Sequence, residues 1–404
     1  MKEKLIISGV LYLIVFGTFA QQKDTVLLPS PFDEGYFFVG PDDLLKFKGY
    51  AQMDFYTPLS ESPGHSEFLI RRARLAATGY LQQNFRYMLY TRFDGGKVQL
   101  NEAFLESRHL AFAHLRVGQF KVPFSLSNLT SSSQINFVER PLVVDNLSPA
   151  YDIGAMLFGQ AFKERIDYAM GIFNGEGRNM NEVNSHKDFI GRLVVAPFKT
   201  NFNSLFQQLY FGISGSYGLK DQPYSTNNFE TGSGIVFFSR SDTTSILNKR
   251  ERVGFDMEWI IGSASFRAEY IQRTDNISKD TKKAILTDKG YYIDFTYLLS
   301  GEKQQRNSPV KPNRELDPKK GYWGAFELAF RYEVLELSDQ NLLAQPNEGA
   351  NRTRPLSGGI NWYPNDDVRI VLNYERLKFS SLINVENNNY KQSNFLKFRF
   401  QYQF

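Results

Sequence analysis

The chain has 404 residues, of which 22% are charged and 15% aromatic. It contains no cysteine, which excludes disulfides, thiol nucleophiles and thiolate metal sites. The formal net charge of +4 is too small to indicate a nucleic-acid-binding protein.

The first twenty residues, MKEKLIISGVLYLIVFGTFA, have the pattern of a secretory signal peptide. A basic start at Lys2 and Lys4 precedes an apolar stretch, and Ala20 marks the cleavage site. An N-terminal anchor helix is the alternative, but the apolar stretch is short for a bilayer span. We expect an exported protein in which residues 21–45 form a periplasmic lead-in.

From residue 46 onward, apolar and polar residues alternate, which is typical of β-strands with two different faces. We count sixteen such segments, which begin near residues 46, 67, 84, 98, 113, 152, 165, 187, 207, 250, 263, 290, 322, 355, 367 and 393. An even number of short alternating segments predicts an all-β fold. That fold is a 16-stranded antiparallel transmembrane β-barrel of the porin type over residues 46–404.

The connections alternate between short and long, as in barrels with short periplasmic turns and long extracellular loops. Long loops are expected at 124–151, 174–186, 219–249, 274–289, 335–354 and 378–392. The short apolar run 235–238 is expected to lie within the loop at 219–249. The connection 301–321 is long where a short turn is expected, so it either folds inward from the periplasm or a strand is miscounted there.

The C-terminal segment NFLKFRFQYQF alternates to its last residue, with Phe400, Tyr402 and Phe404 on one face. It resembles the assembly signal of outer-membrane barrels, so we expect the barrel-assembly machinery as a partner. A soluble barrel is the alternative, but sixteen strands enclose more space than side chains can fill.

The sequence shows no pattern of catalytic or metal-binding residues. The four histidines, at 65, 109, 114 and 186, lack the spacing of a metal site, and no GxSxG sequence occurs. The glycines of FNGEGRN, 173–179, open a loop with no helix after it, which favours a turn over a phosphate-binding loop. We expect no cofactor and no enzyme; the alternatives are a barrel hydrolase and an adhesin or scaffold that acts through its loops.

Three arginines lie in the strand-like run FLIRRARLAATG, 68–79. Arg72 and Arg74 have the parity opposite to the apolar residues, so they are predicted to face the lumen. Arg71 has the lipid-facing parity and is expected near the membrane edge, where a long side chain reaches the interface. On the next strand, Arg86 and Arg92 are inward by the same rule.

Two registers of this strand pair are open, because either Arg72 or Arg74 lies opposite Arg92. Like charges across a strand pair are unfavourable unless they are offset. Asp54 or Asp94 could pair with the arginines, or the wall could attract anions into a water-filled pore.

Charge counting does not decide between these interpretations, because inward carboxylates are nearly as numerous as inward cations. By parity, the further inward cations are Arg116, Arg192, Arg252, Arg267, Arg331, Arg369, Lys397 and Arg399.

Eight segments resemble, in order, the phosphate-selective porin O and P family. They are FLIRRARLAATGYL, LRVGQFKVPFSL, NFVERPL, YDIGAMLFG, YAMGIFNGEG, KDFIGRLVVAPF, GAFELAFRYE and GGINWYPNDDVRIVLNYE. The resemblance covers roughly residues 45–404. It implies a sixteen-stranded outer-membrane barrel, usually trimeric, in which arginines and a constriction lysine conduct phosphate or polyphosphate.

Carried over to this chain, the resemblance assigns Arg72 and Arg74 to the wall and Lys121, in GQFKVPF, to the constriction. Loop 125–150 is then the segment that folds inward, and its Arg140 is a second constriction candidate. The parity of Lys121 points outward unless the strand ends or bulges before Pro123.

We therefore expect a passive outer-membrane porin for small anions, with phosphate as the substrate that the resemblance implies. The expected partners are small anions, outer-membrane lipid and further copies of the chain in a homotrimer. A weakly selective porin for small solutes is the alternative. The candidate pore-lining residues are Arg72, Arg74, Arg86, Arg92, Arg116 and Arg192, with Lys121 and Arg140 at the constriction.

Overall fold

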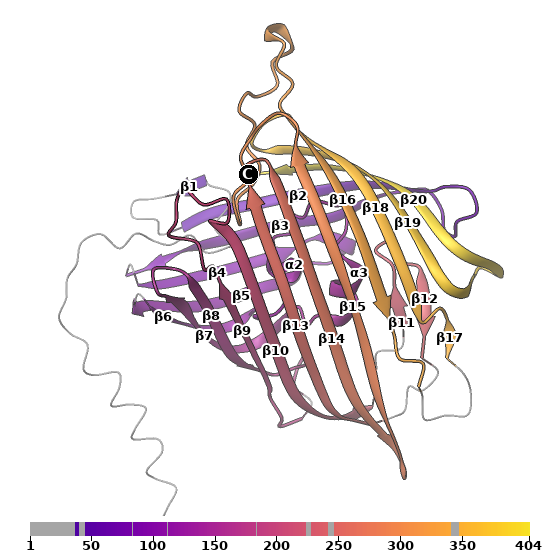
Figure 1. Ribbon diagram of the computed structural model, residues 1–404. Helices are drawn as coiled ribbons and strands as arrows, with labels where there is room; N and C mark the ends of the chain where they lie inside the picture. Colours follow the sequence, from indigo (N-terminus) through magenta and orange to yellow (C-terminus); the bar gives the residue numbers. More distant parts are fainter. Residues whose placement is uncertain are drawn as a thin grey trace, which may run out of the picture. The chain divides into compact units, whose positions relative to one another are not determined.

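Sixteen antiparallel strands form a closed barrel in the computed structural model (Figure 1). The structure describes residues 37–39, 45–82, 84–110, 112–182, 184–223, 228–240, 246–340 and 347–404. The predicted signal peptide and most of the lead-in lie outside these residues. None of the helices in the described residues is long and apolar enough to span a membrane.

Each strand of the barrel pairs with the next along the chain, and β2 closes the ring against β20, from Tyr50 opposite Gln403 to Pro58 opposite Phe395. A short strand, β1 (Phe37–Val39), pairs with the start of β2. The predicted barrel is confirmed. Its strands are β2 (Leu45–Pro58), β3 (Glu67–Leu81), β4 (Phe85–Arg92), β5 (Gln99–Leu110), β6 (Ala113–Lys121), β7 (Tyr151–Ala161), β8 (Ile166–Phe173), β9 (Asp188–Val195), β10 (Gln208–Pro223), β13 (Ile246–Ile261), β14 (Ala264–Lys279), β15 (Lys282–Leu298), β16 (Ala325–Glu336), β18 (Arg352–Tyr363), β19 (Val368–Val385) and β20 (Asn388–Gln403).

The two faces of the wall have opposite polarity. On β15, Tyr291 and Ile293 are exposed on the outer face, whereas Tyr292 and Asp294 are buried on the inner face. The inner charges form ion pairs, such as that of Asp294 with Arg331 at 2.7 Å. An apolar outer face and a polar inner face are what a barrel in lipid requires.

Two predicted long loops are strands instead. β14 and β15 continue through 274–289 to a turn of two residues after Lys279, and β19 and β20 occupy most of 378–392. The second hairpin turns at Glu386 and Asn387, both with positive φ, as tight hairpins require. The prediction was wrong because strand pairing continues where the outer face becomes polar, and the apolar alternation then no longer marks the strand.

Residues 122–150, between β6 and β7, run inside the barrel (Figure 1) and contain α2 (Leu126–Leu129) and α3 (Leu142–Leu147). We call this segment the inward loop. Phe124, Val138 and Val143 of this loop are buried in one apolar cluster. Three side chains of the inner wall accept hydrogen bonds from its backbone: Glu269 from Leu126 and Ser127, Asn373 from Val138, and Glu333 from Leu142. These contacts fix the loop against the side of the barrel formed by β14–β19.

A small sheet lies in the connections at the end of the barrel that carries the long loops. It consists of β11 (Asn228–Glu230), β12 (Val236–Ser239) and β17 (Glu348–Gly349). Its Phe229, Phe237 and Phe238 are buried and belong to the same apolar cluster as the inward loop. The apolar run 235–238 is therefore a strand of this sheet rather than part of the barrel.

The connection between β15 and β16 contacts the inner wall near its start and then projects from the barrel end (Figure 1). Near its start, Gln304 donates to Glu327 at 3.1 Å, and Arg306 donates to Glu258 at 3.0 Å, both on the inner wall. Its projecting part contains the short helix η3 (Pro318–Lys320). The strands on either side are intact, so the length of this connection does not reflect a miscounted strand.

Candidate functional site

The inner face of β3 and β4 presents four arginines to the inward loop. Arg74 lies directly opposite Arg92, which settles the register. A β-bulge opposite Gln52 and Met53 gives β3 one extra residue, Arg71. Arg71 therefore points into the lumen rather than to the membrane edge, and the parity prediction for it was wrong because a bulge shifts the alternation.

Glu139 of the inward loop is the carboxylate at which loop and wall meet. Arg71 Nε donates to its Oε1 at 2.5 Å, and Arg72 Nη2 donates to its Oε2 at 2.9 Å. Burial alone would raise the pKa of Glu139, but the charges of Arg72 and Arg71 outweigh burial and hold that pKa well below its ordinary value. Asp54, which the sequence offered as a partner for these arginines, instead binds Arg399 through two hydrogen bonds of 2.7 Å.

Asp94 partly neutralises the charge of Arg74 and Arg92, which lie opposite each other on β3 and β4. It begins the short helix η2 (Asp94–Gly96) directly after β4, which places its carboxylate beside both Arg74 and Arg92. Arg92 Nη2 lies 3.1 Å from Asp94 Oδ2. One carboxylate shared by two guanidinium groups leaves this pair with a net positive charge.

Lys121 and Arg140 hold the turn that follows α2. Lys121 Nζ donates to the carbonyl oxygens of Asn128 at 2.6 Å and Thr130 at 3.1 Å, and Arg140 donates to that of Thr130 at 2.6 Å. Lys121 is only 7% exposed. Gln119, Phe120 and Lys121 are all buried, so the alternation of exposed and buried residues ends after Val117 and parity does not predict the direction of Lys121.

Arg178, in the loop after β8, reaches the same region. Its guanidinium lies over the ring of Tyr151, 4.2 Å from the centroid. The loop is held by Asn179, whose backbone N–H donates to Gln119 Oε1 at 2.8 Å and whose side chain accepts from Gln119 Nε2 at 2.9 Å. These contacts place Arg178 next to the inner wall, although it is distant in sequence from β3 and β4.

Together these groups form a cluster with an excess of positive charge, which we call the basic cluster. We count in it the seven cations and four carboxylates named below, whose formal net charge is 7 − 4 = +3. Within the described residues, the Nε atoms of Arg92 and Arg178 are buried without a hydrogen-bond acceptor. The cations are Arg71, Arg72, Arg74, Arg92, Lys121, Arg140 and Arg178, and the carboxylates are Asp94, Glu102, Glu139 and Asp145.

The other three pore-lining candidates lie on the inner wall and are not counted in this cluster, although Arg86 and Arg116 also act on the charge of Glu102. Arg116 Nη2 binds Glu106 at 2.6 Å, and its guanidinium lies 4.2 Å from the centroid of the Phe104 ring. Arg86 is 1% exposed and lies near the same ring. Arg192 forms hydrogen bonds of 2.6 and 2.8 Å with Asp256. All three are buried inner-face cations within ion-pair or aromatic contacts.

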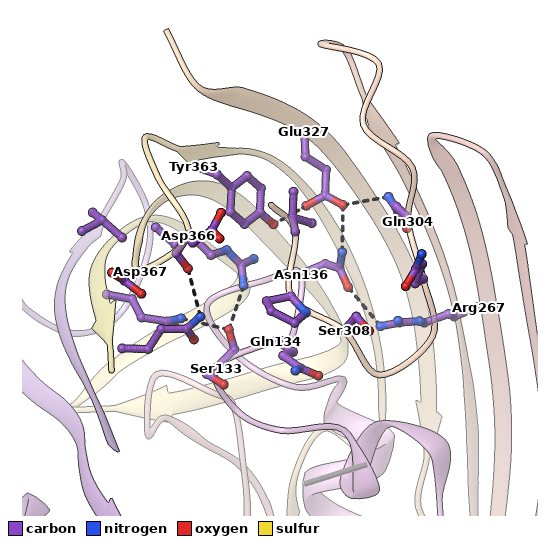
Figure 2. Close-up of a pocket in the computed structure, with 17 residues that line it drawn as sticks. Ser133, Gln134, Asn136, Arg267, Gln304, Ser308, Glu327, Tyr363, Asp366 and Asp367 are labelled. Carbon is purple, nitrogen blue, oxygen red and sulfur yellow. Dashed lines mark hydrogen bonds between the residues drawn. The ribbon is translucent and has the colours of Figure 1, made fainter. Parts of the chain in front are cut away.

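A small polar pocket separates the tip of the inward loop from the connection that follows β15 (Figure 2). Asn136 of the loop accepts from Arg267 and donates to Glu327, each at 3.1 Å, and Gln304 of the connection donates to the same carboxylate. The free space is about 50 Å³, which is room for a few water molecules. Loop and connection therefore meet across this side of the lumen and leave little space between them.

The terminal aromatic residues lie where β20 meets β2. The backbone of Phe404 exchanges two hydrogen bonds of 3.0 Å with Gly49, and its ring stacks on Tyr402. A side chain at Gly49 would collide with the ring of Phe404, since a Cβ there would lie 2.7 Å from it. Leu396, Phe398 and Tyr402 are exposed on the outer face.

Sequence reasoning missed Arg178 and the bulge at Arg71. Arg178 lies in a glycine-containing loop, where no periodicity indicates its direction. No group of three or more potential metal ligands occurs within the ranges that the structure describes.

Comparison with known proteins gives a consistent result. The model of the phosphate-selective porin O and P family matches residues 46–404. Porin O of Pseudomonas aeruginosa is 24% identical over 370 residues, which cover 83% of this chain and 82% of the relative.

Solved structures show the same fold. OmpT of Vibrio cholerae has a TM-score of 0.57 at 11% identity and covers 91% of this chain and 100% of its own. An anion-selective porin from Comamonas acidovorans has a TM-score of 0.55 at 11% identity and covers 90% of this chain and 100% of its own.

Proposed function

Because the chain belongs to the phosphate-selective porin O and P family of the bacterial outer membrane, we propose that its channel conducts small anions, phosphate among them, past the basic cluster. The solved relative from Comamonas acidovorans is described as anion-selective, which supports the same direction of selectivity. The observation that carries the proposal is the excess of seven cations over four carboxylates where the inward loop approaches β3 and β4.

The physical basis is replacement of hydration by charge-assisted hydrogen bonds. A guanidinium group presents several N–H donors in a plane, which suits the oxygens of phosphate. Arg92 and Arg178 are only partly buried, so their guanidinium groups can contact a passing anion. Several weak sites in series let an anion enter and leave again.

A weakly selective porin is the second candidate, and specific contacts favour it. Arg72 is bound to Glu139, and Arg74 is bound to Asp94, so two of the wall arginines are already offset by carboxylates. If these pairs governed permeation, the channel would pass small neutral solutes and ions of either sign.

Reversal potentials across planar bilayers separate the two candidates. In a gradient of potassium chloride, the basic cluster predicts a reversal potential near the equilibrium potential of chloride, and added inorganic phosphate should reduce the chloride current by competing for the same donors. A potential near zero, with no effect of phosphate, would favour the weakly selective porin. A preference for cations would contradict both the proposed role of the basic cluster in selectivity and the proposed mechanism of anion binding.

Family membership indicates a channel rather than an enzyme, and we further propose that the barrel has no catalytic activity. Purified protein should show no hydrolysis of ester or peptide substrates above a detergent blank. Turnover that scales with the amount of protein would contradict this.

We also propose that the protein is a homotrimer, since the OmpT relative has been solved in a trimer form. Light scattering after size exclusion in mild detergent should give three times the protein mass of one chain. A stable monomer that conducts normally would contradict this assembly.

A further inference from the structure

The outer face of β15, β16, β18 and β19 changes from apolar to basic along the strands. In the middle of these strands it carries exposed apolar residues, including Ile293, Leu356, Leu372 and Tyr374. Toward the end with the short turns it stays aromatic, where Phe326 and Trp362 stack with ring centroids 6.0 Å apart. This band is the part of the wall that faces lipid chains.

Toward the opposite, extracellular end, the next outward positions are cations. They follow the same parity as the apolar residues, so they lie on the lipid-facing side of the wall. We call them the outward basic patch: Lys289 on β15, Arg352 and Arg354 on β18, and Arg376 and Lys378 on β19.

The patch has too few carboxylates to balance it. Glu336 binds Arg352 at 2.8 Å and lies 3.8 Å from Lys289. Within the described residues, Arg354, Arg376 and Lys378 form no ion pair, and Arg376 donates to the neutral amide of Gln392. Five cations against one carboxylate give 5 − 1 = +4.

The register adds an independent constraint. Arg354 lies directly opposite Lys378, and both side chains are exposed. Like charges in a cross-strand pair repel each other, and the repulsion is relieved when an anion lies between them. Such an anion would meet this face just beyond the apolar band, at the level of the lipid headgroups.

We propose that the outward basic patch binds the phosphate groups of anionic lipid headgroups in the outer leaflet. Arginine holds phosphate through paired N–H donors and lysine as a point charge, so Arg354, Arg376 and Lys378 together present complementary donors. The patch lies outside the lumen, and this inference therefore holds or fails independently of anion conduction.

The test is retention of lipid A by the full-length protein, with lipid A and its dephosphorylated form as the probes. The variant carries Arg354→Gln and Lys378→Gln, and a matched control carries Lys311→Gln and Lys319→Gln in the projecting connection. Native mass spectrometry measures the bound lipid. Each cation near an anionic surface contributes roughly a fivefold factor, so the variant should bind phosphorylated lipid A about 25-fold more weakly.

Three results would overturn the proposal: equal binding by variant and control, equal binding of both forms of lipid A, or displacement of the lipid by millimolar inorganic phosphate, which would indicate a free-anion site. Loss of the oligomer in the variant would instead assign the patch to contact between copies. If the double variant does not fold, as judged by heat-dependent gel migration, Lys378→Gln alone carries the test with an expected fivefold loss.

Discussion

Two sides of the same lumen use arginine differently. On one side, which we call the paired wall, four arginines each bind a carboxylate one or two strands away, whereas Arg252 and Arg369 donate to backbone carbonyls of the inward loop. The pairs are Arg192 with Asp256, Arg267 with Glu258, Arg273 with Asp288, and Arg331 with Asp294. In the basic cluster, cations exceed carboxylates by three. An arginine that faces the lumen therefore does not by itself make the channel anion-selective. Selectivity depends on the number of carboxylates that lie close to the arginines.

The largest effect is expected from removal of the carboxylate at which loop and wall meet. Glu139→Gln leaves the buried Arg72 and the half-buried Arg71 without their counter-charge, and breaking the buried pair with Arg72 in this way costs about 3–5 kcal/mol. Urea unfolding in liposomes should show this loss of stability. As a control, Glu182→Gln removes the carboxylate of the more exposed pair with Lys187 and should change stability by less than about 1 kcal/mol.

On the paired wall, removing an arginine should affect stability but not selectivity. Arg331→Ala strands the buried carboxylate of Asp294 and also removes a hydrogen bond to the carbonyl of Glu139, so a loss of about 3 kcal/mol is expected. Lys311→Ala, in an exposed pair with Asp366, is the control. A fall in the anion-to-cation permeability ratio in Arg331→Ala would show that the paired wall also contributes to selectivity, which would contradict the distinction between the two sides.

Removing the carboxylate of Asp94 should make the channel more anion-selective. Asp94→Asn removes one of four carboxylates and raises the net charge of the basic cluster from +3 to 7 − 3 = +4. The anion-to-cation permeability ratio should rise by roughly threefold, since a charge in a partly aqueous pore is partly screened. Asp317→Asn in the projecting connection should leave the ratio unchanged.

The smallest effect is expected from mild acid. The folded-state pKa of Glu139 is depressed, so its contribution to stability is present above the unfolded pKa of about 4.3 and is lost only as pH falls through the lower folded value. Lowering the pH from about 7 to about 5 should therefore leave single-channel conductance nearly unchanged. A step in conductance within that window that is absent from Glu139→Gln would show that Glu139 titrates there.

Much of the fold follows from period-two alternation, because each strand separates lipid from water. The same rule placed Arg72, Arg74 and Arg92 on the inner face. It failed at Arg71, where the bulge adds a residue, and beyond the lipid band, where outer residues such as Thr274 and Asn276 are polar. Neither the bulge nor the continuation of the strands beyond the lipid band is marked by the local sequence.

The balance of charge in the candidate site could not be predicted from the sequence. Glu139, Arg140 and Arg178 lie in loops, where position depends on distant contacts such as those of Asn179 with Gln119. Parity alone counted nearly equal numbers of inward cations and carboxylates. The excess appears only when the loops are placed against β3 and β4.

We propose that the basic cluster, rather than the paired wall, makes the channel prefer anions. The most direct test is the reversal potential, in a potassium chloride gradient, of a variant carrying Arg92→Gln and Arg178→Gln, compared with an Arg314→Gln control in the projecting connection. The double variant should lower the anion-to-cation permeability ratio by about three- to tenfold while the control does not. An unchanged ratio in a folded, conducting double variant would contradict this proposal.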